Sequence, residues 1–171
     1  MKWILYVILL IVVLIGAIFL VGYALPAKTT TSRSITLHQP PAAVFAVLVD
    51  VQHMADWNRN TEKVEMLPPT DGRETTKQTF KGGMTMTIIT AKSSPPQHLV
   101  RSLDDDGGPF VGSWNYEITP VDGGSRVVLT EVAIFTNPFF RVMTRVFGAT
   151  KYMDEHLEDL ARKLGETAQV G

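Results

Sequence analysis

The chain has 171 residues, with 16 basic and 17 acidic side chains and a net charge of −1. It therefore lacks the excess of clustered Lys and Arg from which a nucleic-acid interface draws its affinity, and no nucleic-acid partner is expected. The chain contains no cysteine, which excludes disulfides and a thiolate nucleophile.

The first element is an apolar segment, residues 3–25, which contains no charged residue. As a helix it would span roughly 34 Å, enough for a hydrocarbon core of ~30 Å. This pattern predicts a transmembrane anchor over residues 1–27, with a cleavable signal peptide as the alternative. The flanking positive charges are nearly balanced and leave the side of the membrane open. The absence of cysteine favours the outer face of a bacterial inner membrane without deciding it.

A short polar spacer is expected at residues 28–34, followed by one domain at residues 35–166 and a tail at residues 167–171. The first strand is expected over residues 32–39, because this stretch contains β-branched residues and ends at a Pro-Pro pair. The second of these prolines suits the first turn of a helix, which the apolar spacing predicts over residues 41–50.

Six further stretches are short, rich in Val, Ile, Thr and aromatic residues, and separated by turn residues. Because parallel strands would need long crossovers, short turns between strands predict an antiparallel meander. The six predicted strands are residues 62–68, 74–80, 84–90, 97–103, 111–120 and 125–135.

The last predicted element is one long helix, residues 138–164, which would run about 40 Å. Asn137 suits the N-cap, Pro138 suits the first helical position, and Gly165 suits the position after the helix. Its apolar face consists of Phe139, Met143, Val146, Thr150, Met153, Leu157, Leu160 and Leu164.

The order of elements predicts an α+β fold, in which a curved antiparallel sheet of about seven strands wraps around the long C-terminal helix. Three stretches, residues 33–58, 112–131 and 137–166, resemble the START-like (SRPBCC) superfamily and its helix-grip fold. Within it they are most similar to the polyketide cyclase/dehydrase-like group. The resemblance implies a cavity between sheet and helix for an apolar or amphipathic small molecule, but no single reaction, since such folds serve carriers, receptors and cyclases alike.

The cavity wall is expected from residues that share a face with the helix-covered side of the sheet or lie on the helix stripe. Methionines suit such a wall because their flexible side chains accommodate different shapes. Ordinary core packing would produce the same pattern. The ligand-binding candidates are Trp57, Phe80, Met84, Met86, Trp114, Tyr116, Phe135, Phe139, Met143, Phe147, Thr150 and Met153.

Glu131 and Tyr116 are weak candidates for acid–base groups. Alternation from Phe135 places Glu131 on one face of its strand, but the opposite face is apolar too, so the phase is open. If Glu131 faces inward, burial would raise its pKa and make it a possible general base or a ligand anchor.

The four histidines are dispersed, so no metal site and no cofactor are expected. We therefore expect a membrane-anchored binding protein for a lipid, isoprenoid or aromatic metabolite rather than an enzyme. A cyclase/dehydrase-like enzyme that uses a buried carboxylate or tyrosine is the alternative. The ligand and the oligomeric state are left open.

Overall fold

A single antiparallel sheet of seven strands organises the domain. The structure is a computed structural model that describes residues 2–103, 110–148 and 150–171, without the side chain of Phe147. The spatial order β1-β7-β6-β5-β4-β3-β2 follows the chain from β2 to β7, and β1 then pairs with β7. The strands are β1 (Lys28–Leu37), β2 (Thr61–Thr70), β3 (Arg73–Phe80), β4 (Thr85–Ser94), β5 (His98–Leu103), β6 (Val111–Val121) and β7 (Gly124–Ile134).

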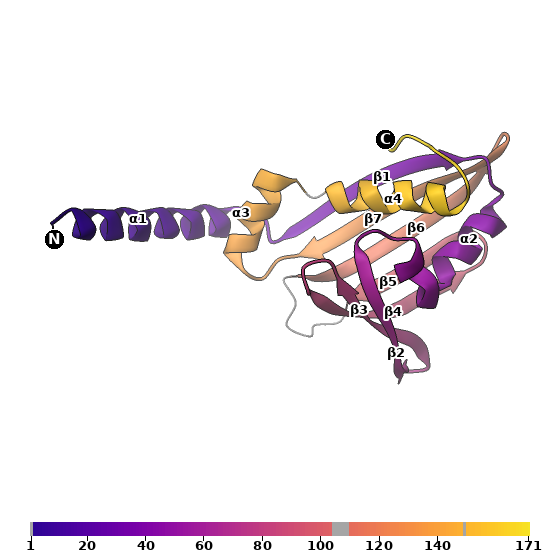
Figure 1. The fold of residues 1–171 in the computed structure, drawn as a ribbon, viewed down its shortest axis with the longest axis horizontal. Coiled ribbons are helices and arrows are strands. Elements are labelled where there is room, and N and C mark those ends of the chain that lie inside the picture. The colour runs from indigo at the N-terminus through magenta and orange to yellow at the C-terminus, as the bar shows by residue number, and fades with distance from the viewer. Residues whose placement is uncertain (1, 104–109, 149) are drawn as a thin grey trace.

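Helices α2 (Pro41–Val49) and α4 (Lys151–Lys163) lie over one face of this sheet, as Figure 1 shows, and the predicted helix-grip fold is confirmed. Helix α2 and the 3-10 helix η1 (Val51–Asp56) follow β1, and α4 packs on β1 and α2. The apolar stripe of α4, formed by Met153, Leu157 and Leu160, joins the main core. The second half of the apolar face predicted for residues 138–164 therefore packs in the core.

The first strand is longer than predicted. Residues 28–34, expected to be a spacer, are the first part of β1, which pairs with β7 from Lys28–Ile134 to Leu37–Ser125. The run of β-branched threonines in this segment suits a strand as well as a linker. Only three residues, 25–27, separate β1 from the preceding helix, and the Phe135 amide donates to the Ala27 carbonyl at 2.9 Å.

The predicted single helix of residues 138–164 is wrong: two helices, α3 (Pro138–Phe147) and α4, occupy this segment. The break lies at Gly148, whose φ of 81° and ψ of 147° are open essentially to glycine alone. The start of the segment is as predicted, because the Asn137 side chain accepts a hydrogen bond from the Phe139 amide at 2.9 Å. The apolar repeat continues across the break, so spacing alone could not reveal it.

Helix α1 (Lys2–Ala24) projects from the domain as a separate rod (Figure 1). It is long and apolar enough to cross a membrane, and a signal sequence would meet the same criteria. Among the described residues of α1, Gly22 alone is buried, against Pro138 at the start of α3. Its end is thus packed against the domain.

Candidate functional site

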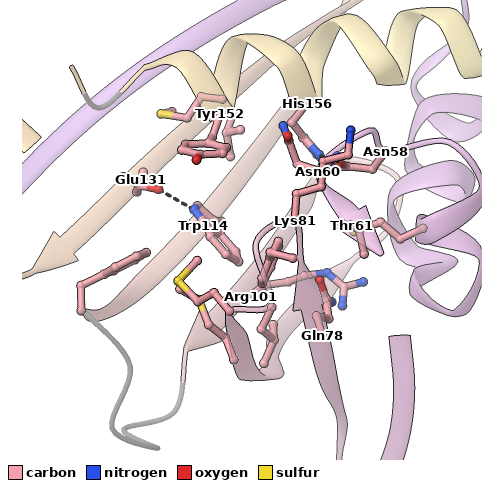
Figure 2. A pocket seen from close by; sticks show the side chains of 18 of the residues that line it. Asn58, Asn60, Thr61, Gln78, Lys81, Arg101, Trp114, Glu131, Tyr152 and His156 are labelled. Carbon is pink, nitrogen blue, oxygen red and sulfur yellow. Dashed lines mark hydrogen bonds between the residues drawn. The ribbon is translucent and has the colours of Figure 1, made fainter. Parts of the chain in front are cut away.

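A cavity of about 470 Å³ lies between the sheet and the C-terminal helices (Figure 2). This volume falls within the range of ~300–1,000 Å³ that is usual for small-molecule pockets. Most of its wall is apolar. Of the residues expected at this wall, eight line the cavity: Phe80, Met84, Met86, Trp114, Tyr116, Phe135, Met143 and Met153.

Three expected wall residues lie elsewhere, and one cannot be placed. Trp57 is buried beside the ring of His156, with centroids 5.4 Å apart, and does not line the cavity. Phe139 and Thr150 are also absent from the wall, because the break at Gly148 turns α3 away from the line of α4. The side chain of Phe147 lies outside the described part of the structure.

Glu131 faces the cavity, which settles the phase of β7. Val127, Leu129, Ala133 and Phe135 are buried on the same side of this strand, and Glu131 lies among the cavity-lining residues. The Trp114 indole N–H, from the paired position on β6, donates to its Oε2 at 2.7 Å (Figure 2). Burial raises the pKa of the Glu131 carboxyl, and the hydrogen bond from Trp114 partly offsets this rise.

Arg101, on β5, is the least expected member of the site. The residue is 2% exposed and lines the cavity. Nη2 donates to the carbonyl oxygens of Leu48 and Val49 at 3.2 and 3.5 Å, and Nη1 donates to Glu74 at 3.4 Å. Burial lowers the pKa of the guanidinium, but an arginine with so high an intrinsic pKa keeps its proton. The cavity therefore contains a fixed positive charge.

Two buried polar atoms at the cavity have no hydrogen-bond partner among the described residues: Arg101 Nε and Thr61 Oγ1. Buried polar groups in folded proteins nearly always have a partner. Both residues line the cavity, so a polar group bound in the cavity is one candidate for this partner.

A hydrogen-bond chain fixes the protonation of the buried His156. The Asn60 amide donates to Asn58 Oδ1 at 2.8 Å, so the side-chain NH₂ of Asn58 is the donor to His156 Nδ1 at 2.6 Å. His156 Nε2 must then carry the hydrogen, and it donates to the Tyr116 hydroxyl at 3.1 Å. Burial lowers the pKa of His156 to about 4, which agrees with a neutral ring.

Tyr116 is consequently a hydrogen-bond donor towards the cavity. Its oxygen accepts from His156, so its own hydrogen is free for another group. Burial raises the pKa of Tyr116 to about 12, which keeps the hydroxyl protonated at neutral pH. Tyr116 and Arg101 both line the cavity. Together they form a donor pair suited to an oxygen acceptor.

The mouth of the cavity is marked by those wall residues that reach solvent. These are Lys81, Met84, Phe140, Gly148 and Tyr152, of which Tyr152 is 69% exposed. Lys81 and Met84 belong to the β3–β4 turn on one side. On the other side, Phe140 lies in the first turn of α3, while Gly148 and Tyr152 lie at the break between α3 and α4 and at the start of α4. A ligand would enter between these two segments.

Sequence reasoning missed the polar groups Asn58, Arg101 and His156. Signals for two of them were present: Arg101 alternates with the buried Leu99 and Leu103, and His156 follows Met153 at helical spacing. A polar residue at an apolar position of a regular pattern indicates a buried functional group.

Among the described residues, no group of three or more His, Cys, Asp and Glu could hold a metal ion.

Comparisons with known proteins agree with this geometry. Three solved structures share the fold: the Zhui aromatase/cyclase from Streptomyces sp. R1128 (TM-score 0.68, 17% identity, 81% of this chain and 94% of that chain), a conserved protein from Geobacillus kaustophilus (0.65, 14%, 83% and 99%) and protein Ms6760 from Mycobacterium smegmatis (0.56, 13%, 80% and 90%). Identities this low establish the fold alone. Among curated proteins, no sequence matches this chain.

The sequence also matches a family model, described as polyketide cyclase/dehydrase and lipid transport, over residues 28–165. The match begins at the first residue of β1 and ends just after α4, so it covers the entire domain that holds the cavity. The chain belongs to the polyketide cyclase/dehydrase and lipid transport family.

Proposed function

We propose that this protein is a membrane-anchored binding protein for an amphipathic small molecule, whose oxygen-bearing end contacts Arg101 and Tyr116. The observation that carries the proposal is the buried Arg101, whose Nε lacks a partner among the described residues at the end of a mostly apolar cavity. A purely apolar ligand would leave this N–H unsatisfied, at a free-energy cost of about 1–3 kcal/mol. A lipid, isoprenoid or aromatic metabolite with a carboxylate or carbonyl group would satisfy it.

The apolar wall supplies most of the binding free energy in this proposal. Methionines at positions 84, 86, 143 and 153 surround the space with flexible, polarizable side chains. Such a wall favours a class of ligands of similar length over a single rigid compound. The donors Arg101 and Tyr116 then determine the orientation of the bound ligand, with its oxygen-bearing end beside them.

Helix α1 supports a location at a membrane. Amphipathic molecules of this kind partition into bilayers, so a pocket tethered there by α1 would remain near its ligand. We propose an uncleaved anchor on a bacterial inner membrane, with the domain on its outer side. Detection of the intact N-terminus in the membrane fraction by mass spectrometry tests this part.

The decisive experiment is native mass spectrometry of the full chain, purified from its host in a mild detergent. A co-purifying amphipathic molecule is expected. Titration with cis-parinaric acid and with its methyl ester then probes the polar end. Because hydrogen bonds to charged groups contribute about 1.5–3 kcal/mol, Arg101→Met should weaken binding of the acid by about 10- to 100-fold and affect the ester less.

Arg126→Met is the matched control, since Arg126 is an exposed arginine on β7 that does not line the cavity. It should bind both probes as the natural chain does. A chain that is always empty and binds neither probe would contradict the proposal. Equal losses for the acid and the ester in Arg101→Met would contradict the assigned role of Arg101.

A second candidate function is a cyclase/dehydrase-like activity, and one observation favours it. The Tyr116 hydroxyl and the Glu131 carboxylate line the same cavity. Ring closure of the aldol type needs a base that removes a proton beside a carbonyl and a donor to the carbonyl oxygen, and these two groups could fill the two roles. Chemical conversion of the co-purified molecule by the natural chain, lost in Glu131→Gln with binding retained, would support this function.

A further inference from the structure

Helix α3 lies between the end of α1 and the mouth of the cavity. Figure 1 shows it at the junction of the projecting helix and the sheet, and α1 and α3 are in contact. At the contact, a Cβ atom on Gly22 would overlap the Pro138 carbonyl, so the two backbones approach as closely as glycine permits. The last turn of α1 and the first turn of α3 are therefore one packed unit.

Arg141 ties this unit together. Its guanidinium donates to Phe135 O at 2.9 Å and Thr136 O at 3.3 Å, and also to Leu25 O at 3.4 Å and Gly22 O at 3.5 Å. The last carbonyl groups of a helix have no partner within the helix and carry a partial negative charge. Arg141 thus supplies both hydrogen bonds and a positive charge at the end of α1. The position of α3 is set by where α1 ends.

The two sides of α3 have different surroundings. Phe140, Met143 and Thr144 line the cavity. Phe139 and Val146 are 37% and 67% exposed, and neither lines the cavity. The sequence of residues 138–147 includes two arginines and no acid. A short helix with exposed apolar side chains and only positive charges fits the headgroup layer of an anionic bilayer.

The depth of α3 relative to the bilayer follows from its contact with Gly22. This residue lies two positions before the end of α1, where a spanning segment of this length would reach the headgroups. We infer that α3 lies in the headgroup layer of the bilayer that holds α1 and forms the membrane side of the cavity mouth, so that ligands pass directly between bilayer and cavity. This inference rests on the proposed binding function and on α1 as an anchor. The partner of the exposed side of α3 is thus a lipid bilayer.

The absence of cysteine from the natural chain allows a clean test. Val146→Cys and Val121→Cys each introduce one site for an environment-sensitive fluorophore at an exposed valine. Val121 is the control because the β6–β7 hairpin lies at the end of the domain away from α1 (Figure 1). Each labelled full-length chain is placed in nanodiscs with or without brominated lipid.

The label at position 146 should emit at shorter wavelength and be quenched by brominated lipid several-fold more strongly than the label at position 121. Equal, weak quenching at both positions would overturn the inference. Transfer of cis-parinaric acid from anionic vesicles gives a second readout. Val146→Asp should slow transfer while the affinity in detergent stays unchanged, and Val121→Asp should alter neither.

The two proposals fail in different ways. Quenching at position 146 without any binding of cis-parinaric acid would support the membrane position of α3 and contradict the binding function. Binding in detergent, with a water-exposed label at position 146, would do the reverse. A loss of detergent affinity in Val146→Asp that equals the loss of transfer rate would assign the effect to the cavity and overturn the inference.

Discussion

His156 Nε2 lies 3.1 Å from the Tyr116 hydroxyl, and the donor in this pair is the histidine. The assignment follows from the Asn60 amide, which orients the Asn58 side chain and so determines which ring nitrogen of His156 carries the hydrogen. A backbone amide just before β2 thereby determines which way the Tyr116 hydroxyl donates. The donor character of Tyr116 is a property of the fold.

Tyr116→Phe should weaken the binding of cis-parinaric acid by about tenfold or more, because a hydrogen bond to a charged carboxylate contributes about 1.5–3 kcal/mol. It should also lower stability by about 1–3 kcal/mol, since the buried His156 Nε2–H loses its acceptor. Fluorescence titration and urea unfolding measure the two effects. Tyr152→Phe is the matched control because Tyr152 is 69% exposed at the mouth. Similar losses in both variants would contradict the role of Tyr116.

The stability of the domain should fall in mild acid because of His156. Its folded-state pKa of about 4 lies below the ordinary value of 6.5, so between these values the unfolded chain binds a proton that the folded chain does not. The stability that depends on the neutral ring is complete above pH 6.5 and is lost as the pH falls towards 4. The loss is about 3 kcal/mol, from the usual 1.36 kcal/mol per pKa unit.

His156→Gln should flatten this part of the profile of unfolding free energy against pH. The difference between variant and natural chain isolates His156 from the carboxylates that titrate in the same range. His53→Gln serves as the control, because His53 is exposed and Asp50 raises its pKa. Parallel profiles for His156→Gln and the natural chain would show that the ring is not the source of the acid sensitivity.

Gly148→Ala should destabilise the domain by about 1–3 kcal/mol, because a Cβ strains the backbone at a φ of 81°. Urea unfolding of the full chain in detergent measures the change. Gly16→Ala in α1 is the control, since that glycine has no heavy atom within 4 Å of an added Cβ and no positive φ. An unchanged or increased stability of Gly148→Ala would indicate that α3 and α4 readily join into one helix.

Arg101→Met should lower the stability of the ligand-free chain by about 1–3 kcal/mol, in addition to weakening ligand binding. The variant removes the donor to the carbonyl oxygens of Leu48 and Val49 and to the Glu74 carboxylate, and leaves these acceptors without it. Unfolding in urea without ligand tests the expectation. An unchanged or increased stability would show that the contacts with Glu74 and Leu48 do not stabilise the domain.

The order of elements could be predicted from the sequence because turn residues and caps are local signals. Asn137 and Pro138 identified the start of α3, and Pro-Pro identified the start of α2. The inward phase of Glu131 could not be predicted, because both faces of β7 carry apolar residues and only pairing with β1 and β6 decides between them. The break at Gly148 was hidden for the same reason: spacing reports which residues are apolar, and not whether the backbone between them is continuous.

The polar end of the cavity lay beyond sequence reasoning for a different cause. Asn58 comes from the loop between η1 and β2, Tyr116 from β6 and His156 from α4, and their contacts join residues up to 98 positions apart. Each is an ordinary residue in its local stretch. The donor function exists only where the three meet, so it depends on the packed fold and has no local pattern.

The three residues between α1 and β1 limit how far the pocket can travel. A flexible linker of so few residues spans only about 10 Å, and here the Ala27 carbonyl is also held by the Phe135 amide. With α1 in a bilayer, the domain stays close to that membrane and cannot carry its ligand to a distant one. Delivery to a distant acceptor would require that acceptor, or a soluble shuttle, to come to the membrane.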